Sequence, residues 1–127
     1  TGKPKGVMVE HEAVAAFVFN QAYVERERVN RVASLAPYSF DGFVFDAFYS
    51  LLQGASCHLF SKETLLDMTR FSEALRHHNI DTFFTTTALF NQLVKAGALD
   101  NTSVKNVLFG GEAADVKVIQ QAIDHYQ

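Results

Sequence analysis

The chain has 127 residues, of which 48% are hydrophobic, and its 11 Lys and Arg residues against 14 Asp and Glu residues give a net charge of −3. This length suits one domain with a single sizeable core rather than two full-sized domains. Because the sequence has no clustered run of Lys and Arg, we do not expect nucleic acid as a partner.

Cysteine content and hydropathy indicate the cellular compartment in which the protein acts. The single cysteine, Cys57, excludes an intrachain disulfide and a CxxC zinc motif. No apolar run reaches the ~20 residues that span a bilayer, and no signal-peptide pattern is present. We therefore expect a cytoplasmic protein that does not act at a membrane. The chain begins at Thr1 in what reads as the middle of a loop, so we also expect a fragment of a longer protein.

The N-terminal half is predicted to alternate strands with helices. Short apolar runs without polar alternation predict strands at residues 6–10, 31–37 and 55–60. Apolar residues at helical spacing predict helices at residues 11–26 and 40–54. Gly54 is placed to end the second of these helices, because glycine readily adopts the left-handed conformation that closes a helix.

The same alternation continues in the C-terminal half. Helices are predicted at residues 62–78, 87–96 and 114–126, and strands at residues 80–85 and 105–109. Over the whole chain, strand and helix alternate about five times, which predicts an α/β fold: one parallel sheet with helices on both faces, in three layers. No repeat or linker divides the chain, so we expect residues 1–127 to form a single unit.

Ligands of such sheets bind beyond the carboxyl ends of the strands, which selects the loops at residues 37–41, 85–87 and 110–113. Residues 1–6 combine glycines with lysines and could hold a phosphate, although a flexible basic terminus explains the same composition. Asp41 could pair with a cation or merely cap a helix, which is the commoner role. Gly110 and Gly111 could admit a ligand to the backbone or form an ordinary tight turn. The five histidines show no metal-ligand spacing, so no metal site is predicted.

The order of these motifs along the chain is specific. TGKPKGV stands at residues 1–7, FD at 40–41 and LFGGE at 108–112. Together they resemble the adenylate-forming enzyme superfamily, and most closely the amino-acid adenylation domains of nonribosomal peptide synthetases, whose phosphate-binding motif reads SGTTGxPKGV. The family usually has Ser two residues after the Asp, where this chain has Phe43. The resemblance covers essentially all 127 residues and implies the flavodoxin-like subdomain that carries most of the substrate pocket.

The resemblance implies roles for individual residues. Asp41 would pair with the α-ammonium group of the substrate, a charge-assisted contact. The pocket-lining positions that match the family are Gly42, Phe45, Phe84, Leu108 and Gly110. The ATP-binding positions are Thr1, Gly2, Lys5 and Gly6 at the pyrophosphate, and Gly111, Glu112 and Ala113 beside the adenine. The catalytic lysine and the ribose-binding aspartate of the family have no counterpart here, so no catalytic residue is assigned and the isolated chain is expected to be inactive.

The implied reaction is attack of an amino-acid carboxylate on the α-phosphate of ATP, which gives aminoacyl-AMP and pyrophosphate for nonribosomal peptide and antibiotic biosynthesis. ATP and Mg²⁺ would be used by the parent enzyme. The implied partners are the rest of the adenylation domain, a carrier domain with phosphopantetheine, and a condensation domain.

The predicted pocket also indicates a substrate class. It holds no charge beyond Asp41, its walls are apolar, and Gly42 and Gly110 are expected to leave volume. Isoleucine is therefore the first choice, with leucine or valine next. The alternatives are an acyl-CoA synthetase-type adenylating fragment, which would lack the ammonium-pairing aspartate, a non-catalytic flavodoxin-like binding module, and a structural interaction domain.

Overall fold

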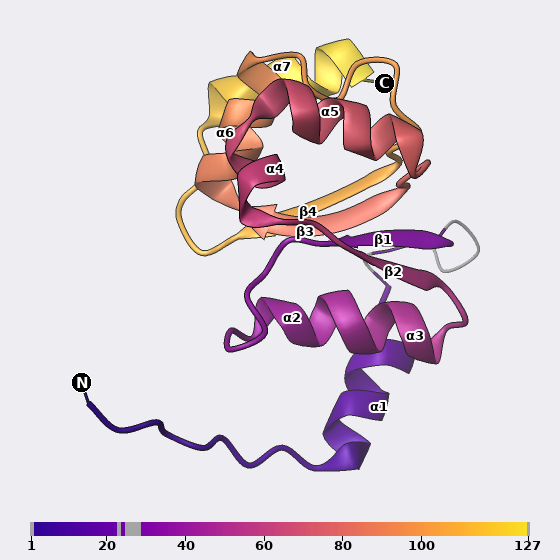
Figure 1. Ribbon diagram of the computed structural model, residues 1–127, viewed down its shortest axis with the longest axis vertical. Helices are drawn as coiled ribbons and strands as arrows, with labels where there is room; N and C mark the ends of the chain where they lie inside the picture. The colour runs from indigo at the N-terminus through magenta and orange to yellow at the C-terminus, as the bar shows by residue number, and fades with distance from the viewer. Residues whose placement is uncertain (1, 23, 25–28, 127) are drawn as a thin grey trace.

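A four-stranded parallel sheet forms the centre of the computed structural model, which describes residues 2–22, 24 and 29–126 (Figure 1). The strands are β1 (Arg31–Ser34), β2 (Ser56–Leu59), β3 (Thr82–Thr86) and β4 (Asn106–Gly110). They lie in the order β2-β1-β3-β4, so the chain crosses from β2 over β1 to reach β3. The register places Phe84 of β3 beside Leu108 of β4, and Thr86 beside Gly110.

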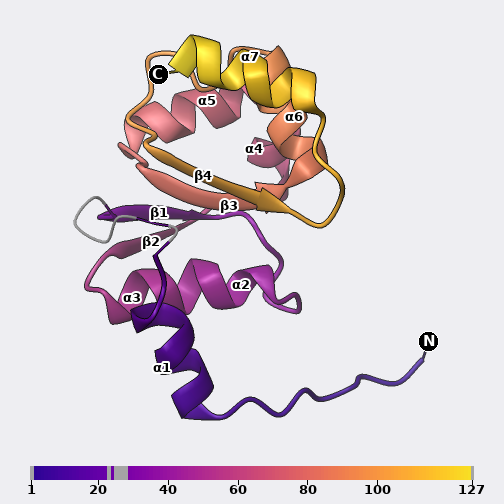
Figure 2. The same cartoon turned by 180° about the vertical axis from the view of Figure 1, so that it is seen from behind.

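Helices cover both faces of this sheet, as the sequence predicted. One face carries α2 (Gly42–Val44), the π-helical turn η2 (Phe45–Tyr49) and α3 (Ser50–Leu52), with α1 (His11–Phe19) packed beneath them (Figure 1). The opposite face carries four helices, with α6 and α7 side by side when seen from behind (Figure 2). These are α4 (Lys62–Leu66), α5 (Met68–His77), α6 (Thr87–Lys95) and α7 (Val116–Tyr126).

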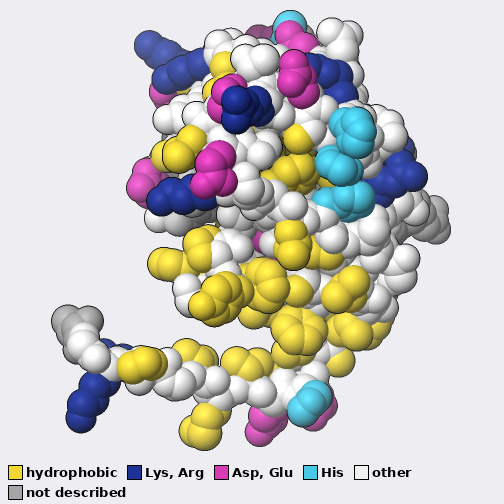
Figure 3. Space-filling model, viewed as in Figure 1, with side chains coloured by type: hydrophobic (Ala, Val, Ile, Leu, Met, Phe, Trp, Pro, Cys, Tyr) yellow, Lys and Arg dark blue, Asp and Glu magenta, His cyan; other side chains and the backbone are white. Residues whose placement is uncertain are grey.

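Each face of the sheet has its own hydrophobic core. On the α5 and α6 side, Phe71, Leu75 and Phe83 are fully buried in one cluster. On the other side, Val32 and Tyr49 are fully buried in a second cluster, which Phe84 and Leu108 border. Neighbouring residues of β3 thus face opposite layers, because side chains alternate along a strand. On the surface, exposed apolar side chains gather over η2 and α3, as Figure 3 shows; they include those of Phe48, Leu51 and Leu52.

The helix predicted at residues 40–54 is present, and it contains one wide π-helical turn. Ser50 explains this widening locally, because its hydroxyl donates to the backbone carbonyl oxygens of Asp46 and Ala47. Gly54 follows the helix with φ of +77°, which agrees with its predicted place at the helix end. The widened turn directs Asp46 toward the end of β1.

Three predicted elements differ from the structure. Residues 6–10 do not form a strand: they are extended and exposed, with Val7 85% accessible, because no described strand lies beside them to pair with their backbone. The helix predicted at residues 62–78 is divided at Asp67, whose carboxylate accepts hydrogen bonds from Thr69 N and Arg70 N and so begins α5. The helix predicted at 11–26 ends at Phe19, and residues 23, 25 and 26 lie outside the described part of the chain.

None of the helices within the described residues is both long enough and apolar enough to cross a membrane.

Candidate functional site

Two adjoining cavities lie at the carboxyl ends of the strands, where the predicted ligand loops meet. The first, here called the edge cavity, has a volume of about 480 Å³. Its lining residues are Leu35, Ala36, Pro37, Phe40, Asp41, Gly42, Phe84, Thr85, Thr86, Leu89, Gly110 and Gly111. The second, the helix-side cavity, has a volume of about 510 Å³. Its lining residues are Val9, Phe17, Asp41, Gly42, Val44, Phe45, Phe84, Leu108 and Phe109.

The structure brings all six predicted substrate-binding residues to these cavities. Asp41, Gly42 and Phe84 line both of them. Gly110 lines the edge cavity, while Phe45 and Leu108 line the helix-side cavity. Residues that are widely separated in the sequence meet here because β1, β3 and β4 run parallel and end at the same edge.

Asp41 has an exposed carboxylate that makes no hydrogen bond to the part of the chain that the structure describes. It occupies the position before α2, and its backbone carbonyl accepts a hydrogen bond from Val44 N at 2.9 Å. Its side chain makes no capping hydrogen bond to the helix. The capping alternative therefore has no support in the structure, and the carboxylate is free to meet a ligand.

The two glycines of the site differ in the space around them. A Cβ atom added to Gly42 would lie 3.1 Å from Ala36 Cβ and 3.3 Å from the ring of Phe84, which is closer than nearly all real contacts of this kind. The expectation that Gly42 leaves open volume is thus wrong, because neighbouring side chains already fill that space. A Cβ atom on Gly110 would lie 4.0 Å from the ring of Phe84, an ordinary contact, so Gly110 does leave room in the edge cavity.

The predicted ATP-binding residues are only partly assembled. Gly111 lines the edge cavity and has φ of +97°, whereas Glu112 and Ala113 are exposed and border neither cavity. The N-terminal positions Gly2, Lys5 and Gly6 are exposed in a segment that runs away from the body of the molecule (Figures 1 and 2). Thr1 lies outside the described residues.

Asp46 is a residue of this region that sequence reasoning missed. Its side chain is fully buried, and its Oδ2 accepts hydrogen bonds from Ser34 Oγ at 3.1 Å and from the backbone N–H groups of Leu35 and Ala36 at 3.0 Å each. Burial raises the pKa of Asp46 to about 6, although these three hydrogen bonds act in the opposite direction. Asp46 therefore holds the loop after β1, one wall of the edge cavity, against η2. The sequence signal that could have identified Asp46 is its position as the one charged residue within the apolar run FVFDAF.

Comparison with known proteins establishes the family. The model of the family described as AMP-binding enzyme matches residues 1–127. The chain belongs to this family. Bacitracin synthase 1 of Bacillus licheniformis is 38% identical over 125 residues, which are 98% of this chain and 2% of that protein. Surfactin synthase subunit 1 of Bacillus subtilis (strain 168) is 38% identical over 123 residues, 97% of this chain and 3% of that protein. The chain thus spans a small part of the length of these relatives.

A solved structure shows the same fold. An NRPS protein containing adenylation and PCP domains superposes with a TM-score of 0.73 at 22% sequence identity, covering 89% of this chain and 23% of that one. The predicted α/β fold and the predicted resemblance to adenylating enzymes are confirmed. This member of the AMP-binding enzyme family therefore carries its candidate site at the strand ends of a fold that adenylation proteins share.

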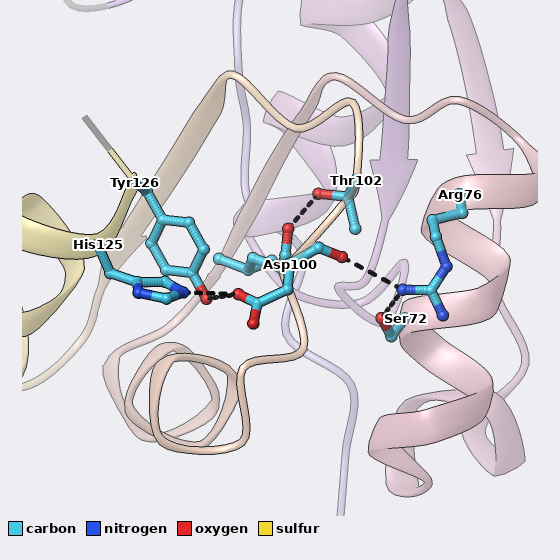
Figure 4. Close-up of polar contacts among 7 residues, drawn as sticks. Ser72, Arg76, Asp100, Thr102, His125 and Tyr126 are labelled. Atoms are coloured by element: carbon cyan, nitrogen blue, oxygen red, sulfur yellow. Dashed lines mark hydrogen bonds and ion pairs between the residues drawn. The ribbon is translucent and has the colours of Figure 1, made fainter.

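A polar cluster elsewhere in this family member joins α7 to the body (Figure 4). None of its residues lines either cavity. Tyr126 Oη donates to Asp100 Oδ1 at 2.8 Å, and His125 Nε2 lies 3.1 Å from the same oxygen. Arg76 Nη1 donates to the backbone carbonyl of Asp100 at 3.3 Å. Burial and the Asp100 carboxylate raise the pKa of Tyr126 to about 12. Because these residues connect α5, α7 and the loop after α6, we assign them a structural role.

Magnesium is implied by the reaction of the family. No group of three or more His, Cys, Asp or Glu side chains among residues 2–22, 24 and 29–126 is placed to hold a metal ion by itself, and Mg²⁺ is usually held by one or two carboxylates together with substrate phosphates.

Proposed function

We propose that this chain supplies the amino-acid pocket of an adenylating enzyme, which activates a branched aliphatic amino acid with ATP for nonribosomal peptide synthesis. One observation carries the proposal: Asp41 is the only charged side chain among the described residues that line the two cavities. It stands where the two cavities meet, and the structure gives its carboxylate no hydrogen-bond partner among those residues.

A free carboxylate beside an apolar hollow fits an amino acid better than a fatty acid. The α-ammonium group forms a charge-assisted hydrogen bond with Asp41, and a fatty acid has no group to do so. The amino-acid carboxylate then attacks the α-phosphorus of ATP, a new P–O bond forms, and the bond to pyrophosphate breaks. The products are aminoacyl-AMP and pyrophosphate.

The walls of the helix-side cavity support an aliphatic side chain. Phe45, Phe84 and Leu108 line it, and burying a polar group against them without a hydrogen bond would cost free energy. Isoleucine is our first choice, with leucine and valine next. A difference of one methylene is worth only ~1–3 kcal/mol, so we expect the selection among these three to be relaxed.

The remaining proposed contacts are with ATP and with neighbouring domains. Gly111 at the edge cavity would lie beside the nucleotide, together with Glu112 and Ala113. Lys5 and its neighbours would meet the pyrophosphate only if their segment folds back toward the strand ends. A carrier domain with phosphopantetheine, and a condensation domain, are the partners that this function requires; the solved relative that contains adenylation and PCP domains supports the first of them.

The test is exchange of labelled pyrophosphate into ATP by the full-length enzyme that carries this chain. We expect exchange with isoleucine, leucine and valine, and little with glutamate or lysine, whose charged side chains the apolar walls exclude. Exchange that depends on a fatty acid, and that amino acids do not support, would replace this proposal with the acyl-CoA synthetase alternative.

A further inference from the structure

Thr85 has a hydroxyl group without a hydrogen-bond partner among the described residues, although each of three threonines close to it makes a hydrogen bond. Thr82 accepts from Asn106 Nδ2 at 3.1 Å, Thr86 accepts from Leu89 N at 3.2 Å, and Thr87 donates to the carbonyl of Glu112 at 3.1 Å. Thr85 is only 4% exposed, and its Oγ has no hydrogen-bond partner among the described residues. It lines the edge cavity.

An unbonded hydroxyl at a buried strand position needs an explanation. Burying it without a partner costs free energy, whereas valine has nearly the same shape and would occupy the position without that cost. The unbonded hydroxyl therefore indicates that a polar group from outside the described chain binds in the edge cavity.

A second, independent feature indicates the charge of that group. The N-terminus of the nine-residue helix α6 opens at the same cavity, since Thr86 at its cap and Leu89 in its first turn are both lining residues. The first backbone N–H groups of a helix lack partners within it, and the helix dipole makes this end partly positive. Both effects favour a negatively charged oxygen. The bond from Thr87 to Glu112 holds this end of α6 in place.

We propose that Thr85 Oγ and the N-terminus of α6 form an anion subsite in the edge cavity, where the hydroxyl donates to a carboxylate or phosphate oxygen of the bound ligand. This inference rests on the proposed function. Asp41 and Thr85 line the same cavity, so one ligand can place a cationic and an anionic group on different residues. The two sources of the anionic oxygen are the α-carboxylate of the amino acid and a phosphate of ATP.

The experiment compares three variants of the full-length enzyme. Thr85→Val removes the hydroxyl and keeps the shape, and Thr85→Ser restores a hydroxyl. Thr82→Val is the matched control, because it removes a buried threonine hydroxyl from the same strand outside both cavities. Pyrophosphate exchange gives the KM values for isoleucine and for ATP, and thermal unfolding reports stability.

We expect Thr85→Val to raise one of the two KM values about tenfold or more, the equivalent of about 1.4 kcal/mol. Thr85→Ser, which keeps a hydroxyl, should have a KM close to the wild-type value. A rise for isoleucine assigns the subsite to the carboxylate, and a rise for ATP assigns it to a phosphate. Thr85→Val should unfold at the same temperature as the wild type or higher, because it loses no bond within the fold. Thr82→Val should unfold at a lower temperature with both KM values unchanged.

Unchanged KM values for both ligands in Thr85→Val would overturn the subsite and leave the proposed function intact. A wild-type enzyme without amino-acid-dependent exchange would instead refute the proposed function. In that case the subsite is tested by calorimetric titration with ATP and, separately, with isoleucine: about tenfold weaker binding of either ligand by Thr85→Val supports it, and equal binding of both overturns it.

Discussion

Replacing Asp41 by asparagine in the full-length enzyme tests the residue on which the proposed function depends. Asn keeps the size of the side chain and removes its charge. Because the Asp41 carboxylate makes no capping hydrogen bond to α2, the fold should lose nothing. We therefore expect a change in substrate binding without a change in thermal stability.

The magnitude follows from the environment of Asp41. Removing one partner of a buried charge pair costs ~2–5 kcal/mol. Asp41 is exposed in the structure, so water screens its charge and the lower end of this range applies. We expect the KM for isoleucine to rise about 30-fold, which corresponds to ~2 kcal/mol, while the KM for ATP stays close to its wild-type value.

The assay is isoleucine-dependent pyrophosphate exchange, with Asp67→Ala as the control. Asp67 is also an aspartate at the beginning of a helix, but its carboxylate does accept hydrogen bonds from α5 and it borders neither cavity. Alanine removes this acceptor, which asparagine would keep, so the control should lower the unfolding temperature and leave both KM values unchanged. If Asp41→Ala loses stability as Asp67→Ala does, and Asp41→Asn keeps its KM for isoleucine, Asp41 is a structural residue and the reasoning fails.

Two further predictions concern Asp46 and the glycines. Because the pKa of Asp46 is raised from 3.8 to about 6, its stabilising contribution is complete below about pH 4 and is lost as the pH rises through 6. The stability of Asp46→Asn relative to wild type should thus increase by about 3 kcal/mol between about pH 4 and pH 7.5, measured by unfolding at both pH values; a constant difference would contradict the raised pKa. Gly42→Ala should cost ~1–3 kcal/mol of stability because its Cβ would meet Ala36 and Phe84. Gly110→Ala should unfold at the wild-type temperature, because its Cβ would meet the ring of Phe84 at an ordinary 4.0 Å; equal unfolding temperatures of the two variants would refute this distinction.

Local patterns in the sequence predicted most of the fold, because most of its strands and helices have apolar residues at regular spacing. β1 and α6 begin at the predicted residues 31 and 87, and Gly54 ends its helix as expected. The strand predicted at residues 6–10 was wrong, because an apolar run indicates burial but does not show whether a neighbouring strand is present to pair with it. The break at Asp67 was missed because the charged and apolar residues on both sides continue one helical pattern.

The candidate site was predictable only in part, for a related reason. The motif resemblance located Asp41 and the residues around Phe84, since these stand in a fixed order along the chain. The importance of Asp46 and Thr85 depends on which hydrogen bonds exist in three dimensions. Asp46 makes three through one oxygen, whereas Thr85 Oγ makes none within the described chain. A sequence shows the presence of a hydroxyl or a carboxylate, but not whether folding uses it.

The packing around Phe84 explains how the carboxylate of Asp41 is held at one position in the site. The ring of Phe84 fills the space beside Gly42, and this contact leaves no room for a side chain at that position. Asp46 fastens the loop after β1 to η2 from within the core. Asp41, the residue before Gly42, is thereby held where the two cavities meet, and its carboxylate has no hydrogen-bond partner among the described residues. In the proposed function, this one carboxylate among the described cavity-lining residues gives the cationic group of the ligand a single place to bind, and the apolar walls select the rest of the ligand by shape.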